Sequence, residues 1–257
     1  MKKAILISID GMRPDGFLQC GNPYGTELMS DWAYTLSART VMPSVTLPCH
    51  LSMFYGVPPT RHGITTNTFM PSLQPLNGIF EHLSNAGKRC ASFYAWEQLR
   101  DLGHPGSVKF TGYRNAWMDE TSDGVITDLA LDCIKKDSPD FVFLYLGDTD
   151  EKGGHGYGWM SPEYLNYISL ALDCVKRVAE ACPDYDIIVT ADHGGHERTH
   201  GTDRNEDMTI PQFYRCEGIK NGTDLGEISI LDIAPTVADL FGLAPAEEWE
   251  GMSLLSR

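Results

Sequence analysis

The chain has 257 residues, of which 42% are hydrophobic and 21% charged, a composition typical of one large folded domain that excludes disordered and fibrous proteins. Its 20 Lys and Arg residues against 35 Asp and Glu residues give a net charge of -15, which argues against general binding to nucleic acid polymers or anionic membranes. If the substrate is an anion, bound metal ions have to supply the positive charge, and the 8 His residues and many Asp residues could hold them.

The first predicted element is a strand at 4–9 (AILISI), an unbroken apolar run that ends at Asp10-Gly11. Such a run is typical of a buried strand, and the loop after it often carries functional residues, although an Asp there can also simply cap the next helix. The run is too short for a secretory signal, no apolar run is long enough to span a membrane, and the 7 Cys residues form no C-x-x-C pair. We therefore expect a cytoplasmic protein with reduced thiols.

The segment at 42–52 (MPSVTLPCHLS) places Thr46 at the start of a predicted helix. A Thr in this position is usually an N-cap. The free N–H groups and the dipole of a helix N-terminus also suit a phosphoryl oxygen, and a hydroxyl bound there to a divalent metal can become a nucleophile. The two interpretations of Thr46 do not exclude each other.

Residues 63–119 differ from the rest, because they are rich in Gly, Pro, Asn, Trp and Tyr. A helix is predicted at about 78–85 and a strand at about 89–95. We interpret the segment as partly sheet and partly loops that overhang the site. Its aromatic residues, Trp96 among them, are candidates for stacking on a substrate, although such residues more often belong to the core.

A helix is predicted at about 121–136 and a strand (FVFLYL) at 141–146. The possible caps of the helix are Thr121, Ser122 and Asp123, and its predicted apolar stripe is Ile126, Leu129, Ala130, Cys133 and Ile134. The stretch after the strand, DTDEKGGHGYG at 148–158, combines carboxylates and a histidine with glycines. Alone it could be an acidic turn, but together with the next cluster it is better explained as one of two adjacent metal sites.

A longer helix is predicted from Ser161, the expected N-cap, to about Cys182, and it is followed by a strand (DIIVT) at 186–190. The densest group of ligand-type residues comes next, with five of them at 192–200. Asp and His side chains are typical ligands of zinc or manganese, and the glycines among them allow close backbone approach. Histidines of a polar loop can be merely solvated, but this density after a buried strand favours a metal site.

Strands that alternate with helices in this way predict an α/β fold, with a mostly parallel central sheet and helices on both faces. We find no repeat or long linker and expect a single domain, 1–257. In such sheets ligands bind beyond the carboxyl ends of the strands. The acidic residues that follow three of the predicted strands should therefore converge on one place: Asp10, Asp148 or Asp150, and Asp192.

Four motifs together resemble the alkaline phosphatase superfamily, in particular its nucleotide pyrophosphatase/phosphodiesterase branch. They are SIDGMRPD at 8–15, MPSVTLPCH at 42–50 with GVPPTRHGI at 56–64, TDEKGGHGYG at 149–158, and ADHGGHERTHG at 191–201. They follow one another in the family's order, and a later stretch at 229–236 resembles the helix that closes the fold. The resemblance implies an alkaline-phosphatase-like fold with a small, loop-rich cap.

The resemblance also implies two divalent metal ions, zinc in the first place and manganese as the alternative. Its implied ligands are Asp10, Thr46, Asp192 and His193 for one ion, and Asp150, His155 and His200 for the other. Thr46 would be the catalytic nucleophile that becomes transiently phosphorylated.

Two positions depart from the family pattern. The resemblance leads us to expect an Asn three residues after the Thr, donating to a phosphoryl oxygen, where this chain has Cys49, and a thiol is a poor donor. Substrate charge would then depend more on metals and backbone, which leaves the preferred leaving group and the transferred group open. The stretch from Asp150 to His155 is one residue longer than the usual Asp-x-x-Gly-His spacing. A loop could absorb the extra glycine, but Asp148 then competes as the ligand.

We expect a metal-dependent hydrolase of small phosphate esters, in the first place of phosphodiester or nucleotide pyrophosphate bonds, that acts through a phosphothreonine. Candidate substrate contacts are Cys49, Trp96, Tyr157 and Trp159. Alternatives are a phosphonoacetate-hydrolase-like, phosphomonoesterase or sulfatase-like enzyme, the last disfavoured because a sulfatase needs Cys or Ser at the nucleophile position. A phosphomutase is disfavoured because relatives of that type carry large inserted domains. A non-catalytic metal- or nucleotide-binding relative is disfavoured by the intact ligand set.

Overall fold

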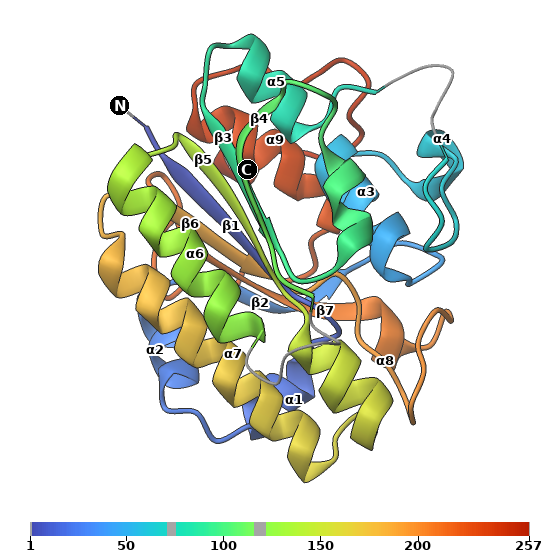
Figure 1. Ribbon diagram of the computed structural model, residues 1–257. Coiled ribbons are helices and arrows are strands. Elements are labelled where there is room, and N and C mark those ends of the chain that lie inside the picture. Colours follow the sequence, from blue (N-terminus) through green and yellow to red (C-terminus); the bar gives the residue numbers. More distant parts are fainter. Residues whose placement is uncertain (1, 71–75, 116–121, 257) are drawn as a thin grey trace.

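The computed structural model describes residues 2–70, 76–115 and 122–256 (Figure 1). One sheet lies at its centre, built of β1 (Ala4–Ile9), β2 (Ala33–Arg39), β3 (Cys90–Tyr94), β4 (Val108–Tyr113), β5 (Phe141–Leu146), β6 (Asp186–Thr190) and β7 (Thr209–Arg215). The strands of this 7-stranded sheet are ordered β2-β7-β6-β1-β5-β3-β4. Strand β7 is antiparallel to β2 and β6, and the other neighbouring pairs are parallel. The predicted, mostly parallel α/β sheet is confirmed.

Helices cover both faces of the sheet. One face carries α1 (Pro14–Gln19), α2 (Tyr24–Asp31), α6 (Ser122–Asp137) and α7 (Pro162–Ala181). The other carries α3 (Thr46–Tyr55), α5 (Ile79–Asn85) and α9 (Ile233–Leu240). Figure 1 shows α6 and α7 side by side in front of the sheet, with α5 and α9 behind it. The short helices are α4 (Pro59–His62) and α8 (Asn205–Met208), with 3₁₀ turns at Glu97–Leu102, Ile230–Asp232 and Leu254–Ser256.

The sheet register brings the carboxyl ends of β1, β5 and β6 together. Strand β1 lies between the other two, and its Ile9 pairs with Leu146 while Ser8 pairs with Thr190. Every residue of β1 and β5 is buried, because helices cover both faces, and this explains the unbroken apolar runs of the sequence. The predicted convergence of three strand ends at one edge follows from this order.

The sequence signals for α7 are confirmed. Ser161 is the N-cap, and its Oγ accepts a hydrogen bond from the N–H of Tyr164 at 3.1 Å. Pro162 is the first residue of the helix, which ends at Ala181, two residues before Pro183.

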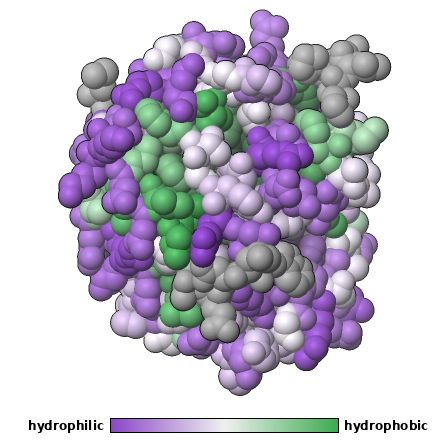
Figure 2. Space-filling model, viewed as in Figure 1, coloured by the Kyte–Doolittle hydropathy of each residue, from purple (hydrophilic) through white to green (hydrophobic). Residues whose placement is uncertain are grey.

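The predicted apolar stripe of α6 is wrong at Leu129. The buried residues of this helix include Ile126 and Ala130, whereas Leu129 is 41% exposed. The helix buries a stripe that passes through positions four apart, and Leu129 lies at its margin. Figure 2 shows exposed apolar area over α6 on a face that is otherwise largely hydrophilic. Thr121, a predicted cap, lies outside the described residues.

The segment at 63–119 contributes more to the body of the fold than to a cap. Helix α5 and strand β3 lie where they were predicted, and β4, which the sequence did not indicate, extends the sheet to its edge. Residues 71–75 and 116–119 of the segment lie outside the described residues. Among the helices that are described, none combines the length and the apolar character needed to cross a membrane.

Candidate active site

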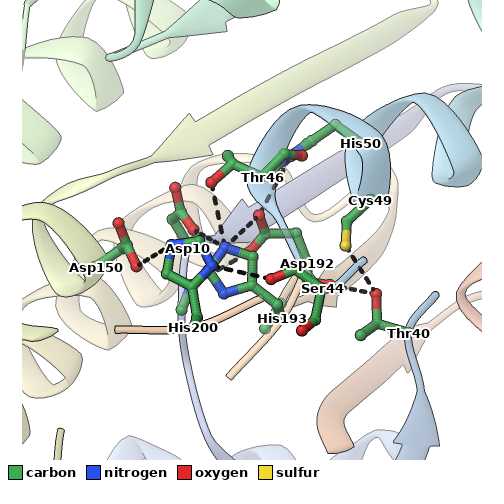
Figure 3. A network of polar contacts seen from close by, with 12 residues as sticks. Asp10, Thr40, Ser44, Thr46, Cys49, His50, Asp150, Asp192, His193 and His200 are labelled. Carbon is green, nitrogen blue, oxygen red and sulfur yellow. Dashed lines mark hydrogen bonds and ion pairs between the residues drawn. The ribbon is translucent and has the colours of Figure 1, made fainter. Parts of the chain in front are cut away.

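Two groups of acidic and histidine side chains lie side by side at the carboxyl edge of the sheet (Figure 3). The first cluster consists of Asp10, which follows β1, and of Asp192 and His193, which follow β6. His193 Nε2 lies 3.3 Å from Asp10 Oδ1 and 3.4 Å from Asp192 Oδ2. All three side chains are buried.

The second cluster consists of Asp150, His155 and His200. His155 Nε2 lies 3.5 Å from Asp150 Oδ2, and His200 Nε2 lies 3.9 Å from Asp150 Oδ1. The loop after β1 reaches this cluster through Gly11, whose φ is +66° and where an added Cβ would stand 2.9 Å from Asp150 Oδ1. Glycine is therefore required where the two clusters meet.

The hydrogen bonds of the three histidines fix how each ring is oriented, with Nδ1 toward a carbonyl and Nε2 toward the carboxylates. Each ring donates its Nδ1–H to a backbone carbonyl at 2.7–2.9 Å, His193 to Gly194, His155 to Arg198 and His200 to Ser44. A neutral imidazole that donates through Nδ1 carries a lone pair on Nε2, so lone pairs of nitrogen and of carboxylate oxygen face one another in both clusters. They repel unless a cation lies between them.

Buried oxygen atoms without hydrogen-bond partners support the same conclusion. Among the described residues, Asp10 Oδ1, Asp150 Oδ1 and Asp192 Oδ2 are buried and accept no hydrogen bond. Such orphaned acceptors are costly in a protein interior. Nitrogen and carboxylate ligands, with the far side of each imidazole held by a carbonyl, are the arrangement that zinc and manganese take in proteins. The residues of both clusters therefore fit divalent cations.

Burial shifts the pKa values of the first cluster toward the neutral form of each side chain. Burial raises the pKa of Asp192 to about 7. Burial, reinforced by Asp192 and Asp150, raises the pKa of Asp10 well above its ordinary value. Burial and the neighbouring His200 lower the pKa of His193 well below its ordinary value. The site therefore disfavours net charge of either sign on its own side chains, and bound cations would relieve the repulsion between the carboxylates.

Thr46 is the first residue of α3, and its hydroxyl faces the first cluster (Figure 3). Thr46 Oγ1 lies 3.2 Å from His193 Nε2, and the residue is 4% exposed. The N-cap of the helix is Val45, without a side-chain cap bond, so the interpretation of Thr46 as an N-cap is wrong. One turn later, His50 donates Nδ1–H to the Thr46 carbonyl at 2.8 Å and holds this end of the helix in place.

Cys49 lies away from the site. Its thiol is fully buried and accepts a hydrogen bond from Thr40 Oγ1 at 3.2 Å, and burial raises its pKa. The thiol also lies near the Pro43 carbonyl, at 3.7 Å, in the segment that precedes α3. The substrate contact of Cys49 stays a prediction, and the contacts of the thiol join it to Thr40 and Pro43 rather than to Thr46.

Asn67, which the sequence analysis did not single out, lies at the N-terminus of α3. Its Oδ1 accepts the Leu47 N–H at 3.0 Å, which leaves its Nδ2 group as a donor beside Thr46. Most of the N–H groups expected to be free at the start of α3 are not free. Pro48 has no N–H, and the Cys49 N–H donates to the Val45 carbonyl at 3.0 Å. The sequence feature that could have indicated Asn67 is its position just after the RHGI motif.

The extra residue between Asp150 and His155 is accommodated by a π-helix, Thr149–Tyr157, rather than by a loop. Such a helix pairs residues five apart, so Asp150 and His155 lie on one face, as residues four apart do in an α-helix. The Gly158 N–H donates to the Gly153 carbonyl, five residues back, at 3.1 Å. The insertion therefore keeps both ligands together.

Asp148 is engaged elsewhere. Its carboxylate accepts hydrogen bonds from the Ser122 hydroxyl and the Asp123 N–H at the start of α6, and it forms an ion pair with Lys152 at 2.9 Å. Of the two candidate ligands, the structure brings Asp150 to the histidines and turns Asp148 to a helix end.

The predicted aromatic substrate contacts differ in position. Trp159 is 7% exposed, donates Nε1–H to the Gly11 carbonyl at 3.0 Å and packs behind His155 and His200, so it supports the site from inside. Tyr157, at the end of the π-helix, is 54% exposed and free to meet a substrate. Trp96 is half-buried at the start of the Glu97–Leu102 turn, and within the described residues no hydrogen bond or ring contact joins it to either cluster.

Two further contacts were not anticipated from the sequence. The Tyr145 hydroxyl, near the end of β5, donates to Asp10 Oδ2 and orients that carboxylate. His196 of the 192–200 loop belongs to neither cluster, because its Nδ1 bonds to buried Asp207 at 2.7 Å. A hydroxyl within an otherwise apolar strand was the available signal for Tyr145.

Comparison with known proteins gives a consistent result. The profile of the family "Type I phosphodiesterase / nucleotide pyrophosphatase" matches residues 4–208. Phosphopentomutase of Symbiobacterium thermophilum is 27% identical over 196 residues, which is 74% of this chain and 46% of that protein. Human ectonucleotide pyrophosphatase/phosphodiesterase family member 1 is 25% identical over 219 residues, 74% of this chain and 23% of that protein. The chain spans less than half the length of these relatives.

Solved structures share the fold. Murine ectonucleotide pyrophosphatase/phosphodiesterase 5, as an inactive Thr-to-Ala variant in complex with AMP, superposes with a TM-score of 0.80 at 15% identity, covering 95% of this chain and 96% of that one. The phosphonate monoester hydrolase of Agrobacterium radiobacter superposes with a TM-score of 0.77 at 15% identity, covering 99% of this chain and 76% of that one.

Proposed function

Because the chain belongs to the type I phosphodiesterase / nucleotide pyrophosphatase family, we propose that it hydrolyses phosphodiester or nucleotide pyrophosphate bonds of small molecules, with Thr46 as the nucleophile. The first cluster and Thr46 would hold one divalent cation, and the second cluster another. Zinc suits these ligands best, and manganese is the alternative. Such cations supply Lewis acidity that lowers the pKa of the Thr46 hydroxyl and neutralises charge on the phosphoryl and leaving oxygens.

The position of Thr46 carries this proposal. Its Oγ1 is 3.2 Å from His193 Nε2, at the edge of the first cluster and next to the second. In-line phosphoryl transfer needs a nucleophile between groups that position it and groups that stabilise the leaving oxygen. A buried hydroxyl at the start of a helix, held by His50 and facing two ligand clusters, meets that requirement.

The chain's own residues then perform a two-step reaction. The Thr46 oxygen forms a bond to phosphorus as the bond to the leaving oxygen breaks, and the hydroxyl proton passes to solvent. The leaving oxygen takes a proton from solvent, and water next attacks the phosphorus on Thr46, which releases the Thr46 hydroxyl and the remaining phosphate monoester as products. Asn67 Nδ2 is placed to donate a hydrogen bond to a phosphoryl oxygen in both steps, since its Oδ1 is already held by Leu47.

A second candidate is transfer of the phosphoryl group from Thr46 to a sugar hydroxyl instead of water. The 27% identity with a phosphopentomutase favours it. The match covers 46% of that protein, so this candidate is supported by the shared part alone. Hydrolysis of a phosphonate ester would use the same two clusters and differs only in the group transferred.

The test is a panel of nitrophenyl esters assayed with the zinc-loaded protein: a phosphodiester, a phosphomonoester and a phosphonate. We expect many turnovers per enzyme, with the diester fastest. Thr46→Ala should lower kcat by at least about a thousandfold with little loss of zinc, because the three residues of the first cluster remain. Thr46→Ser retains a hydroxyl and should keep measurable turnover.

Rapid quenching followed by intact-mass measurement should detect one phosphoryl group on the wild type and none on Thr46→Ala. Full activity of Thr46→Ala would remove the covalent step from the proposal. No turnover of any ester by zinc-loaded wild type would leave a non-catalytic binding protein as the better account.

A further inference from the structure

The turn that carries the second cluster is tied to the start of α6 by a reciprocal pair of buried carboxylates. Asp123 accepts the Gly147 N–H at 2.8 Å and the Asp148 N–H at 3.3 Å. Asp148 in return accepts hydrogen bonds from Asp123 N–H and the Ser122 hydroxyl. Asp123 and Asp148 are each only 5% exposed, so these bonds form in the interior.

Capping of α6 does not require this arrangement. Asp148 and Ser122 already meet at the N-terminus of the helix, where a carboxylate is favoured by the dipole. Asp123 points the other way, from the first helical turn back to the end of β5. Two neighbouring carboxylates in the interior repel each other. Burial of a carboxylate is also unfavourable unless hydrogen bonds compensate for the hydration that it loses. The extra cost indicates that the turn itself is what Asp123 stabilises.

The ligands of the two clusters are held differently. In the first cluster, the Tyr145 hydroxyl donates to Asp10, and the Gly11 N–H donates to Asp192 Oδ1 at 3.2 Å. In the described part of the chain, Asp150 accepts no such bond and meets only the Nε2 atoms of the second cluster. Its orientation therefore depends on the backbone turn two residues earlier.

We propose that Asp123 is a positioning residue for the second metal site: by holding the Gly147 and Asp148 N–H groups, it sets the turn from which Asp150 and the π-helix project. This inference rests on the proposed function, since it assumes that the second cluster holds a cation. The first cluster, whose carboxylates have donors of their own, should be nearly independent of Asp123.

The test is calorimetric titration of the metal-free protein with zinc alone, with two variants and a control. Asp123→Ala removes both acceptors and should weaken the second ion by about 10- to 100-fold, while the first ion binds as in wild type. Asp123→Asn keeps one oxygen that can accept the Gly147 N–H, so it should recover most of the lost affinity.

Thr127→Val is the matched control. Thr127 is fully buried one turn further along α6 and donates to the Asp123 carbonyl at 2.7 Å, so this change removes a buried hydrogen bond of the same helix without touching the turn. It should lower the melting temperature but leave both affinities unchanged. Circular dichroism establishes that each variant is folded.

Two results overturn the inference without affecting the proposed function: Asp123→Ala binding both ions as tightly as wild type, or folded Asp123→Ala and Asp123→Asn losing affinity equally at both sites. If the wild type itself binds no zinc, the proposed function fails and the inference fails with it.

Discussion

The imidazole rings of His193 and His200 stack on each other, with ring centroids 3.9 Å apart and an angle of 16° between the planes. One ring belongs to the first cluster and the other to the second, so a single aromatic contact joins the two sites. Burial and the neighbouring His200 lower the pKa of His193, so its ring stays neutral and can offer Nε2 to a cation. The two sites are therefore expected to act as a unit.

Replacing the histidines of the 192–200 loop one at a time distinguishes metal ligands from residues with a structural role. His200→Ala should lower the affinity of the second ion by at least about a hundredfold, because it removes one of three ligands. His196→Ala is the matched control, since His196 bonds to Asp207 and belongs to neither cluster. Zinc content after gel filtration checks this prediction, and equal zinc loss in both variants would contradict the assignment of the second cluster.

Asn67 and Cys49 offer a direct comparison between a residue found in the structure and one expected from the sequence. Asn67→Ala should lower kcat by roughly a hundredfold, because it removes a donor to the phosphoryl oxygen. Cys49→Ala should change kcat by less than about twofold and cost about 1 kcal/mol of stability, because it only opens a small cavity. Steady-state kinetics and thermal unfolding check both. The reverse pattern would restore position 49 to the site.

Zinc affinity should depend on pH in the neutral range. Burial raises the pKa of Asp192 to about 7, so below that pH the metal-free protein holds a proton there that zinc must displace. Affinity should fall by at least about tenfold for each unit below pH 7, because the raised pKa of Asp10 adds to the protons that zinc must displace. His193 does not account for this dependence, because burial keeps it neutral. Competition with a chromophoric chelator checks it, and equal affinity at pH 8 and pH 6 would count against the buried carboxylates.

Deletion of one glycine from the Gly153-Gly154 pair tests the role of the π-helix. The deletion places the two ligands four residues apart, which is one face of an ordinary α-helix, so the second ion should bind within about tenfold of its wild-type affinity. Deletion of exposed Asp173 from α7 is the control, because it rotates all later residues of that helix by about 100° and removes Val175 and Val178 from the core. Only the control should fail to fold. A folded glycine deletion that has lost the second ion would show that the π geometry itself is needed.

Much of the fold and of the candidate site could be predicted from local sequence. The runs 4–9 and 141–146 are unbroken because strands covered on both faces have no polar side, and that pattern is visible without knowledge of partners. The place of Asp10 and Asp192 then follows, because parallel strands end at one edge of a sheet. Ligand types directly after a strand are therefore readable from sequence.

The tertiary structure decided which of several similar side chains face the site. Asp148 and Asp150 have the same chemistry. Asp148 accepts a hydrogen bond from the N-terminus of α6, whereas Asp150 faces the histidines. Asn67 accepts the Leu47 N–H, next to Thr46, from a loop twenty residues further along the chain, and Trp159 is buried behind the histidines. The sequence by itself determined the strand ends and the kinds of ligand, because burial pattern and chemistry are local. Packing between distant elements decided which oxygen, nitrogen or ring faces the two clusters, because that direction is set by contacts that no local pattern records.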